Sequence, residues 1–153
     1  MVDSFSKYDR LPLFLLGAIR VHPETAVQAN VSRQNYSVLP HDWYVDADYR
    51  CPRCGEEFCF TVAEQRHWYE ELGFTVDSKA KHCLACRRDL RRLKATKQEY
   101  DREIASTLCS QDIARKQRLI TVIDELCEGG LELPEKIREN RRILAQQIAK
   151  QPR

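Results

Sequence analysis

Two Cys-x-x-Cys pairs constrain the fold of this chain more than any other feature of its sequence: Cys51-Pro52-Arg53-Cys54 and Cys83-Leu84-Ala85-Cys86. Two thiolates separated by two residues can reach one metal ion only if the backbone turns tightly between them. In the first pair, Pro52 presets φ for that turn, and Gly55 permits the conformation that follows it. The second pair leads straight into a strongly helical sequence. We therefore expect its cysteines at or in the first turn of a helix, where the helix dipole favours thiolate.

The two pairs together predict one structural Zn²⁺ ion bound by Cys51, Cys54, Cys83 and Cys86. Four thiolates close the coordination sphere and leave no position for water, so such an ion stabilises the fold and does not catalyse a reaction. The alternative is that the pairs are redox-active or merely packed, but a thioredoxin-like site would need a βαβ pattern that the sequence lacks. We expect His82 to lie beside the site and not to bind the metal. The other cysteines, Cys59, Cys109 and Cys127, are expected to be packed thiols.

The number and arrangement of the cysteines also bear on the compartment. Seven is an odd number, and four of them sit in metal-type pairs, which favours a reducing environment, the cytoplasm, over a disulfide framework. The longest apolar run, Leu11 to Ile19, is far shorter than the roughly 20 residues of a membrane span, and no basic leader precedes it. We expect this run to face a core and the protein to have no membrane association.

The aromatic residues place the core between Trp43 and Phe74, where eight of them fall. Within this block, Thr61-Val62-Ala63-Glu64 is a capping box that predicts a helix start, and Gly73 is suited to end the same helix. The expected inner side of this helix carries Gln65, Trp68, Tyr69 and Leu72. A neighbouring group of carboxylates, Asp42, Asp46 and Asp48, offers acid chemistry or a second ion as alternatives, but we expect a solvated turn.

Beyond Cys86 the sequence predicts three consecutive helices. The apolar stripes are Leu90, Leu93, Tyr100 and Ile104; then Leu119, Val122, Ile123 and Leu126, closed by Gly129-Gly130; then Ile137, Leu144 and Ile148, with Pro134 in the first turn. Because these stripes are narrow, each helix must cover its apolar side against another surface. We expect packing within a monomer, with a homodimer as the alternative.

These patterns predict a small α+β zinc-stabilised module, made of a knuckle, a short β-hairpin and an inserted helix, followed by an α-helical C-terminal region. The expected division is an irregular N-terminal extension at 1–42 that packs on the module, the zinc-binding module at 43–90, and a helical appendage at 91–153. The first helix of the appendage should start near 84–87.

Three motifs occur in order between residues 43 and 88: Trp43-Tyr44-x-Asp46-x-x-Tyr49-x-Cys51-x-x-Cys54-Gly55, Phe60-Thr61-x-x-Glu64-Gln65-x-x-Trp68-Tyr69 and Cys83-x-x-Cys86-Arg87-Arg88. With these motifs, the segment resembles a bacterial family of probable zinc-ribbon or treble-clef-like zinc-binding domains. The resemblance implies zinc at the four cysteines and a knuckle-plus-helix fold, but it implies no activity. This chain departs from the family pattern at Arg53, where an acidic residue is frequent, and the departure changes the charge that a partner would meet.

No sequence motif points to catalysis, because the chain has no Gly-rich phosphate loop, Gly-x-Ser-x-Gly elbow or His-Glu-x-x-His helix. We therefore expect a binding protein without catalytic residues, most simply a protein-interaction adaptor. The formal net charge of only +2 does not indicate a general affinity for nucleic acid. One local run does offer that alternative: Arg87, Arg88, Arg91, Arg92, Lys94 and Lys97, opposed over this span only by Asp89. The simpler interpretation of the run is a solvated helix face that also offsets the anionic zinc centre.

Overall fold

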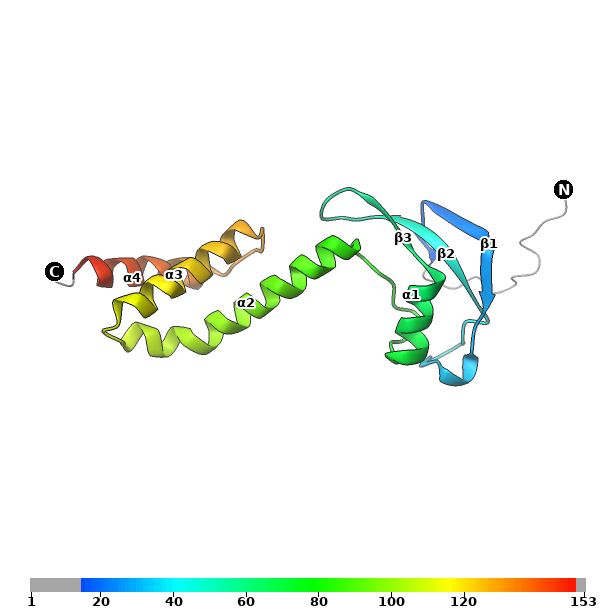
Figure 1. The fold of residues 1–153 in the computed structure, drawn as a ribbon, viewed down its shortest axis with the longest axis horizontal. Coiled ribbons are helices and arrows are strands. Elements are labelled where there is room, and N and C mark those ends of the chain that lie inside the picture. Colours follow the sequence, from blue (N-terminus) through cyan, green and yellow to red (C-terminus); the bar gives the residue numbers. More distant parts are fainter. Residues whose placement is uncertain (1–14, 151–153) are drawn as a thin grey trace. The chain divides into compact units, whose positions relative to one another are not determined.

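The computed structural model describes residues 15–150, which form parts of two compact units, Met1–Cys86 and Arg87–Arg153 (Figure 1). The first unit contains a three-stranded antiparallel sheet and a short helix, and the second is helical. Helix α2, Leu84–Cys109, begins in the last residues of the first unit and continues into the second. This is the predicted fold class, a zinc-site module followed by helices. No helix in this part of the chain is long and apolar enough to span a membrane.

The sheet has the strand order β1-β2-β3, with β1 at Arg20–Gln28, β2 at Trp43–Arg50 and β3 at Glu57–Phe60. Strands β2 and β3 form the predicted hairpin, and the first cysteine pair lies in their connection. The sheet packs with the following helix around one aromatic core, whose buried members are Tyr44, Ala47, Tyr49, Phe60, Tyr69, Val76 and Ala80. The zinc-site region is therefore attached to the central strand of this sheet.

Strand β1 lies within the segment that we expected to be an irregular extension. Pro23 falls inside this strand, at a register shift between His22 and Val27. There the hydroxyl of Thr25 donates to the carbonyl of His22 (2.7 Å) and accepts from the N–H of Asp46 (2.9 Å). An edge strand with a bulge tolerates a proline that a central strand would not, so the proline did not prevent strand formation here.

The apolar run from Leu11 to Ile19 faces the core only in part. Residues 11–14 lie outside the described part of the chain. Of the remainder, Leu15 and Ala18 pack against the aromatic core, whereas Leu16 and Ile19 are exposed.

The acidic residues near the first cysteine pair do not form the solvated turn that we expected. Asp46 and Asp48 lie within β2, and only Asp42 precedes it. The Oδ1 of Asp46 accepts from the N–H of Val62 (2.6 Å), at the start of the next helix, and the Oδ2 of Asp48 lies 2.8 Å from Nε2 of His22. Both carboxylates therefore connect β2 to neighbouring elements of the fold.

The predicted capping box does begin a helix. In α1, Val62–Arg66, the Thr61 hydroxyl accepts from the N–H of Glu64 (3.2 Å), and the helix continues as the π-helical segment η4, His67–Glu71. Gly73 follows with φ of 69°. Gln65 and Tyr69 are buried, but Leu72 is half exposed, because the wider turns of a π-helix shift the inner face away from the 3.6-residue phase.

The second unit contains the three predicted helices: α2, then α3 at Ile113–Glu128 and α4 at Glu135–Ala149. Its core is formed by Leu93, Tyr100, Leu119, Val122, Ile123, Leu126, Ile137 and Leu144. Pro134 is the residue that caps α4 rather than a member of its first turn. Cys109 and Cys127 are exposed, so the expectation of packed thiols is wrong for both. Cys127 sits one residue beyond the buried Leu126, outside the apolar stripe.

Candidate metal centre

The first cysteine pair sits in a tight turn at the end of β2. The N–H of Cys51 donates to the carbonyl of Glu56 (2.8 Å), and the N–H of Gly55 donates to the carbonyl of Cys51 (2.9 Å). Gly55 has φ of 79°, a left-handed conformation that costs glycine little. These bonds fold the backbone back on itself and bring both side chains of the pair to one side, as the spacing predicted.

The second pair sits at the start of α2. Cys83 immediately precedes the helix, and Cys86 lies in its first turn. The sulfur of Cys83 accepts a hydrogen bond from the N–H of Cys86 (3.5 Å), one of the free N–H groups of a helix start. A thiolate gains from this position, since both the N–H group and the helix dipole favour negative charge there.

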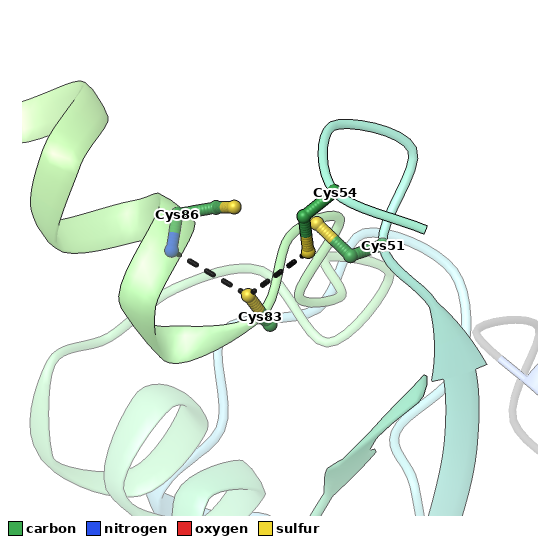
Figure 2. Close-up of side chains that lie close together, drawn as sticks. All are labelled: Cys51, Cys54, Cys83 and Cys86. Atoms are coloured by element: carbon green, nitrogen blue, oxygen red, sulfur yellow. Dashed lines mark hydrogen bonds between the residues drawn. The ribbon is translucent and has the colours of Figure 1, made fainter. Parts of the chain in front are cut away.

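The four sulfur atoms converge on one point (Figure 2). All four Sγ atoms lie within 4.8 Å of one another, and those of Cys54 and Cys83 are 3.8 Å apart. A regular tetrahedron with Zn–S bonds of about 2.3 Å has sulfur atoms about 3.8 Å apart. The donor set and spacing thus fit one tetrahedral ion, and the four cysteines are positioned to bind a single structural Zn²⁺.

The electrostatics of the four thiols favour a cation. Burial opposes ionisation of Cys51, but the backbone N–H groups of Cys54, Cys83 and Arg53 donate to its sulfur and lower the pKa to about 5. Burial and the neighbouring sulfur atoms together raise the pKa of Cys86 to about 12. The Cys51 thiolate therefore forms readily, while ionisation of Cys86 would be favoured by a positive charge among the sulfur atoms. A bound Zn²⁺ would supply that charge and displace the remaining protons.

His82 lies beside the site, as expected. Its Nδ1 atom is 3.8 Å from the sulfur of Cys51, and the metal-ligand group in the described chain consists of the four cysteines alone. Cys59 is the remaining cysteine of this unit. It is half-buried in β3, away from the ligand group, where burial and the nearby Asp48 carboxylate raise the pKa of its thiol to about 11.

The sequence analysis did not identify how Gln65 supports the module. Its side chain is fully buried, and its Nε2 group donates to the carbonyls of Val45 (2.7 Å) and Phe60 (2.8 Å). One amide thereby joins α1 to β2 and β3. The sequence predicted only that Gln65 lies on the inner side of the helix. It could not predict the two accepting carbonyls, because they belong to other elements of the fold.

The predicted basic residues occupy the first turns of α2 beyond the metal ligands. Arg88, Arg91, Arg92 and Lys94 are exposed, and Arg87 is half-buried. They follow Cys86 directly along the same helix.

The comparisons with known proteins agree with this centre. No curated protein and no solved structure matches the chain. One family model does match, over residues 45–95, and its description is a probable treble clef domain. This segment contains all four converging cysteines, the β2–β3 hairpin and the start of α2. Residues 45–95 are thus similar to a probable treble clef domain, and together with the four converging cysteines this similarity supports a zinc-binding structural domain.

Proposed function

We propose that this chain is a non-catalytic zinc-binding protein that acts as a protein-interaction adaptor in the cytoplasm. A four-cysteine site has no open coordination position for a substrate or a reacting water, which supports a purely structural role for the metal. All seven cysteines are free thiols, which suits a reducing compartment.

An exposed apolar surface on the zinc-binding unit carries the proposal. We call it the apolar patch, and its residues are Tyr36, Val38, Leu39, Leu72 and Phe74. Val38 is 81% exposed, and Leu39 is 52% exposed. Single exposed apolar residues are common on protein surfaces. Here several occur in two adjoining segments, 36–39 and 72–74, and such a group marks an interaction surface.

Hydrogen bonds hold the two segments of the patch together and in shape. The side chain of Gln34 donates to the carbonyl of His41 (2.8 Å) and accepts from its N–H (2.9 Å), which closes the loop at its base. Asn35 joins the loop to the other segment, since its side chain donates to the carbonyl of Gly73 (3.1 Å) and its own carbonyl accepts from the N–H of Val76 (3.0 Å). A preordered loop loses little conformational entropy when it binds.

The test is affinity capture from the native cell with three forms of the full chain: wild type, Val38→Ser/Leu39→Ser, and the control Leu16→Ser. Leu16 is also exposed but is not part of the patch. We expect at least one protein to be retained by the wild type and the control and lost from the double variant. That protein should then form a complex with the purified wild type in sedimentation velocity. If the double variant retains the same proteins as the wild type, the patch is not the adaptor surface.

Nucleic-acid binding by α2 is the second candidate function, and one observation favours it. Every arginine of α3 and α4 lies within 4.0 Å of a carboxylate: Arg115, Arg118, Arg138, Arg141 and Arg142. Among the described residues, Arg88, Arg91, Arg92 and Lys94 have no such ion pair. These four cations therefore differ from the arginines of α3 and α4, whereas Lys97, further along the same predicted run, is paired with Asp101 (2.6 Å).

A further inference from the structure

We propose that the cationic face of α2 docks on the phosphate backbone of B-form duplex DNA without reading its sequence. The cationic face consists of Arg87, Arg88, Arg91, Arg92 and Lys94. This inference rests on the nucleic-acid alternative above and specifies its ligand. It is independent of the adaptor surface, which lies in the other unit.

The cations form one continuous surface of the helix. With 3.6 residues per turn, Arg87, Arg88, Arg91, Arg92 and Lys94 fall within an arc of about 160°. Leu93 lies on the opposite side and is part of the buried core of the second unit, whereas Leu90 lies at the edge of the arc next to Lys94. Asp89 falls outside the cationic arc. The core thus orients the helix so that Arg88, Arg91, Arg92 and Lys94 are exposed, while Arg87 is half-buried. Arg92 also lines a pocket with Glu125 and Glu128 of α3.

The absence of aromatic residues among the cations favours a duplex over a single strand as the ligand. Proteins that bind single strands without sequence preference stack the bases on aromatic side chains next to a cationic groove. No aromatic residue occurs between Cys86 and Tyr100, and Tyr100 is buried, with its hydroxyl accepting from Asn140 (2.7 Å). The cationic face can neutralise phosphates but offers no surface on which an unpaired base could stack.

The shape of the element favours B-form DNA over duplex RNA. An α-helix with its side chains is about 10–12 Å across, which matches the B-form major groove of about 12 Å. The major groove of A-form RNA is too narrow for a helix to enter. Arginine and lysine are usual partners of backbone phosphates, and such contacts position a protein on a duplex without carrying sequence information.

The experiment measures binding of the full zinc-loaded chain to a labelled 20-base-pair DNA duplex, the same sequence as duplex RNA, and single-stranded DNA. Fluorescence anisotropy is recorded at 50 and 200 mM salt. Engagement of three to five phosphates predicts that the affinity for duplex DNA falls by roughly 40-fold to 500-fold between these concentrations. We expect binding to duplex RNA and to single-stranded DNA to be at least tenfold weaker.

Two double variants locate the surface. Arg88→Glu/Arg92→Glu reverses two charges of the cationic face. The control Lys136→Glu/Lys150→Glu makes the same change in net charge at two exposed lysines, one in α4 and one at its C-cap. Zinc content and far-ultraviolet circular dichroism confirm that both variants fold. We expect the first to weaken binding to duplex DNA at least tenfold and the second to change it less than threefold.

Each other outcome overturns part of the proposal. Equal or tighter binding to single-stranded DNA or duplex RNA would remove the assignment to B-form duplex while leaving nucleic-acid binding in place. Equal losses in the two variants would mean that net charge, not this face, drives association. An absence of binding to all three probes at 50 mM salt would remove the nucleic-acid function itself, with the adaptor proposal still subject to its own capture test.

Discussion

The four metal ligands differ in their exposure to solvent. Cys51 and Cys86 are buried, Cys83 is half-buried and Cys54 is exposed. Because Cys51 and Cys86 are buried, a polar side chain substituted at either position would be left in the interior without a metal to bind. The ligands are nevertheless equivalent in chemistry, because each supplies one sulfur to the same tetrahedral site.

Replacement of one ligand is expected to abolish stable zinc binding. Serine oxygen is a poor ligand for Zn²⁺ compared with thiolate, so Cys51→Ser should lower the zinc content from about one ion per chain to well below half after dialysis. Elemental analysis of the purified protein measures this content. Cys59→Ser is the matched control and should keep its zinc, because Cys59 is not in the ligand group. Loss of zinc from the control, or full zinc in Cys51→Ser, would contradict the assignment.

A histidine and an aspartate link β1 to the central strand, β2. Nε2 of His22 lies 2.8 Å from Oδ2 of Asp48, and Nδ1 of His22 lies 3.5 Å from Glu24. The hydrogen bond with Asp48 raises the pKa of His22 above its ordinary value of 6.5, against a smaller opposing effect of burial and of Arg20. The same bond lowers the pKa of Asp48 below 3.8. The neighbouring thiol of Cys59 acts in the same direction on Asp48.

This pair predicts a pH-dependent contribution to stability. The contribution of His22 is complete below 6.5 and is lost as pH rises through its raised folded-state pKa. The contribution of Asp48 is complete above 3.8 and is lost as pH falls through its lowered pKa. His22→Gln should therefore lower the midpoint of thermal unfolding more at pH 5.5 than at pH 8.5.

The measurement compares variant and wild type at each pH, so pH effects that are common to both, including those on zinc, cancel. In an Asp48→Asn background the extra loss at low pH should shrink, because the partner carboxylate is absent. An equal loss from His22→Gln at both pH values would show that the pair contributes no charge-dependent stability.

At the level of elements, the contact between α2 and the end of α3 depends on a glycine. A Cβ atom added at Gly129 would lie 2.4 Å from Cδ2 and 3.1 Å from Cγ of Leu93, which is buried in the core. Gly129 has φ of −67°, so any residue could adopt its backbone conformation. The need for glycine here is therefore one of space and not of backbone strain.

Gly129→Ala is expected to destabilise the helical unit by about 1–3 kcal/mol, the usual cost of overpacking a core. Urea denaturation followed by circular dichroism at 222 nm measures the free energy of unfolding. In a Leu93→Ala background the same substitution should cost much less, because the clashing atoms are gone. Equal costs in the two backgrounds would mean that the loss does not come from this contact.

For the whole molecule, the two units should depend on zinc to different extents. The first unit has a small aromatic core, and zinc binding can supply on the order of 10 kcal/mol of folding free energy to such a domain. The core of the second unit consists of residues from α2, α3 and α4 and contains none of the ligands. We expect chelation to unfold the first unit and to leave most of the helices.

The two tryptophans provide the measurement, because Trp43 and Trp68 both lie in the first unit. A strong chelator should shift tryptophan emission toward that of exposed indole while most of the ellipticity at 222 nm remains. Addition of excess Zn²⁺ should restore the emission. Unchanged emission after complete removal of the metal would contradict a structural role for the ion.

The oligomeric state is a further property of the whole chain. The predicted stripes of α3 and α4 are largely buried within the second unit, including Ile123, Leu126 and Leu144. These residues are therefore already covered, and we expect a monomer. Light scattering over a hundredfold range of concentration should give one constant mass of 17.9 kDa. A mass that rises toward twice this value would support the homodimer.

The sequence by itself determined the features that depend on residues close together in the chain. The ligand set follows from two spacings of two residues, and the start of α1 follows from Thr61 and Glu64. The three C-terminal helices follow from apolar residues three or four apart. Each of these signals is complete within one or two helical turns, and so can be recognised without knowing what the segment packs against.

The tertiary structure alone decided the features that join distant segments. Strand β1 exists because it pairs with β2, Asp46 and Asp48 have their roles because Val62 and His22 lie beside them, and the apolar patch is assembled where Asn35 meets Thr75. The exposure of Cys109 and Cys127 likewise depends on which face of each helix the other helices cover. Partners separated by tens of residues leave no periodic signal in one sequence, because the free energy that pairs them is gained only when the whole unit packs.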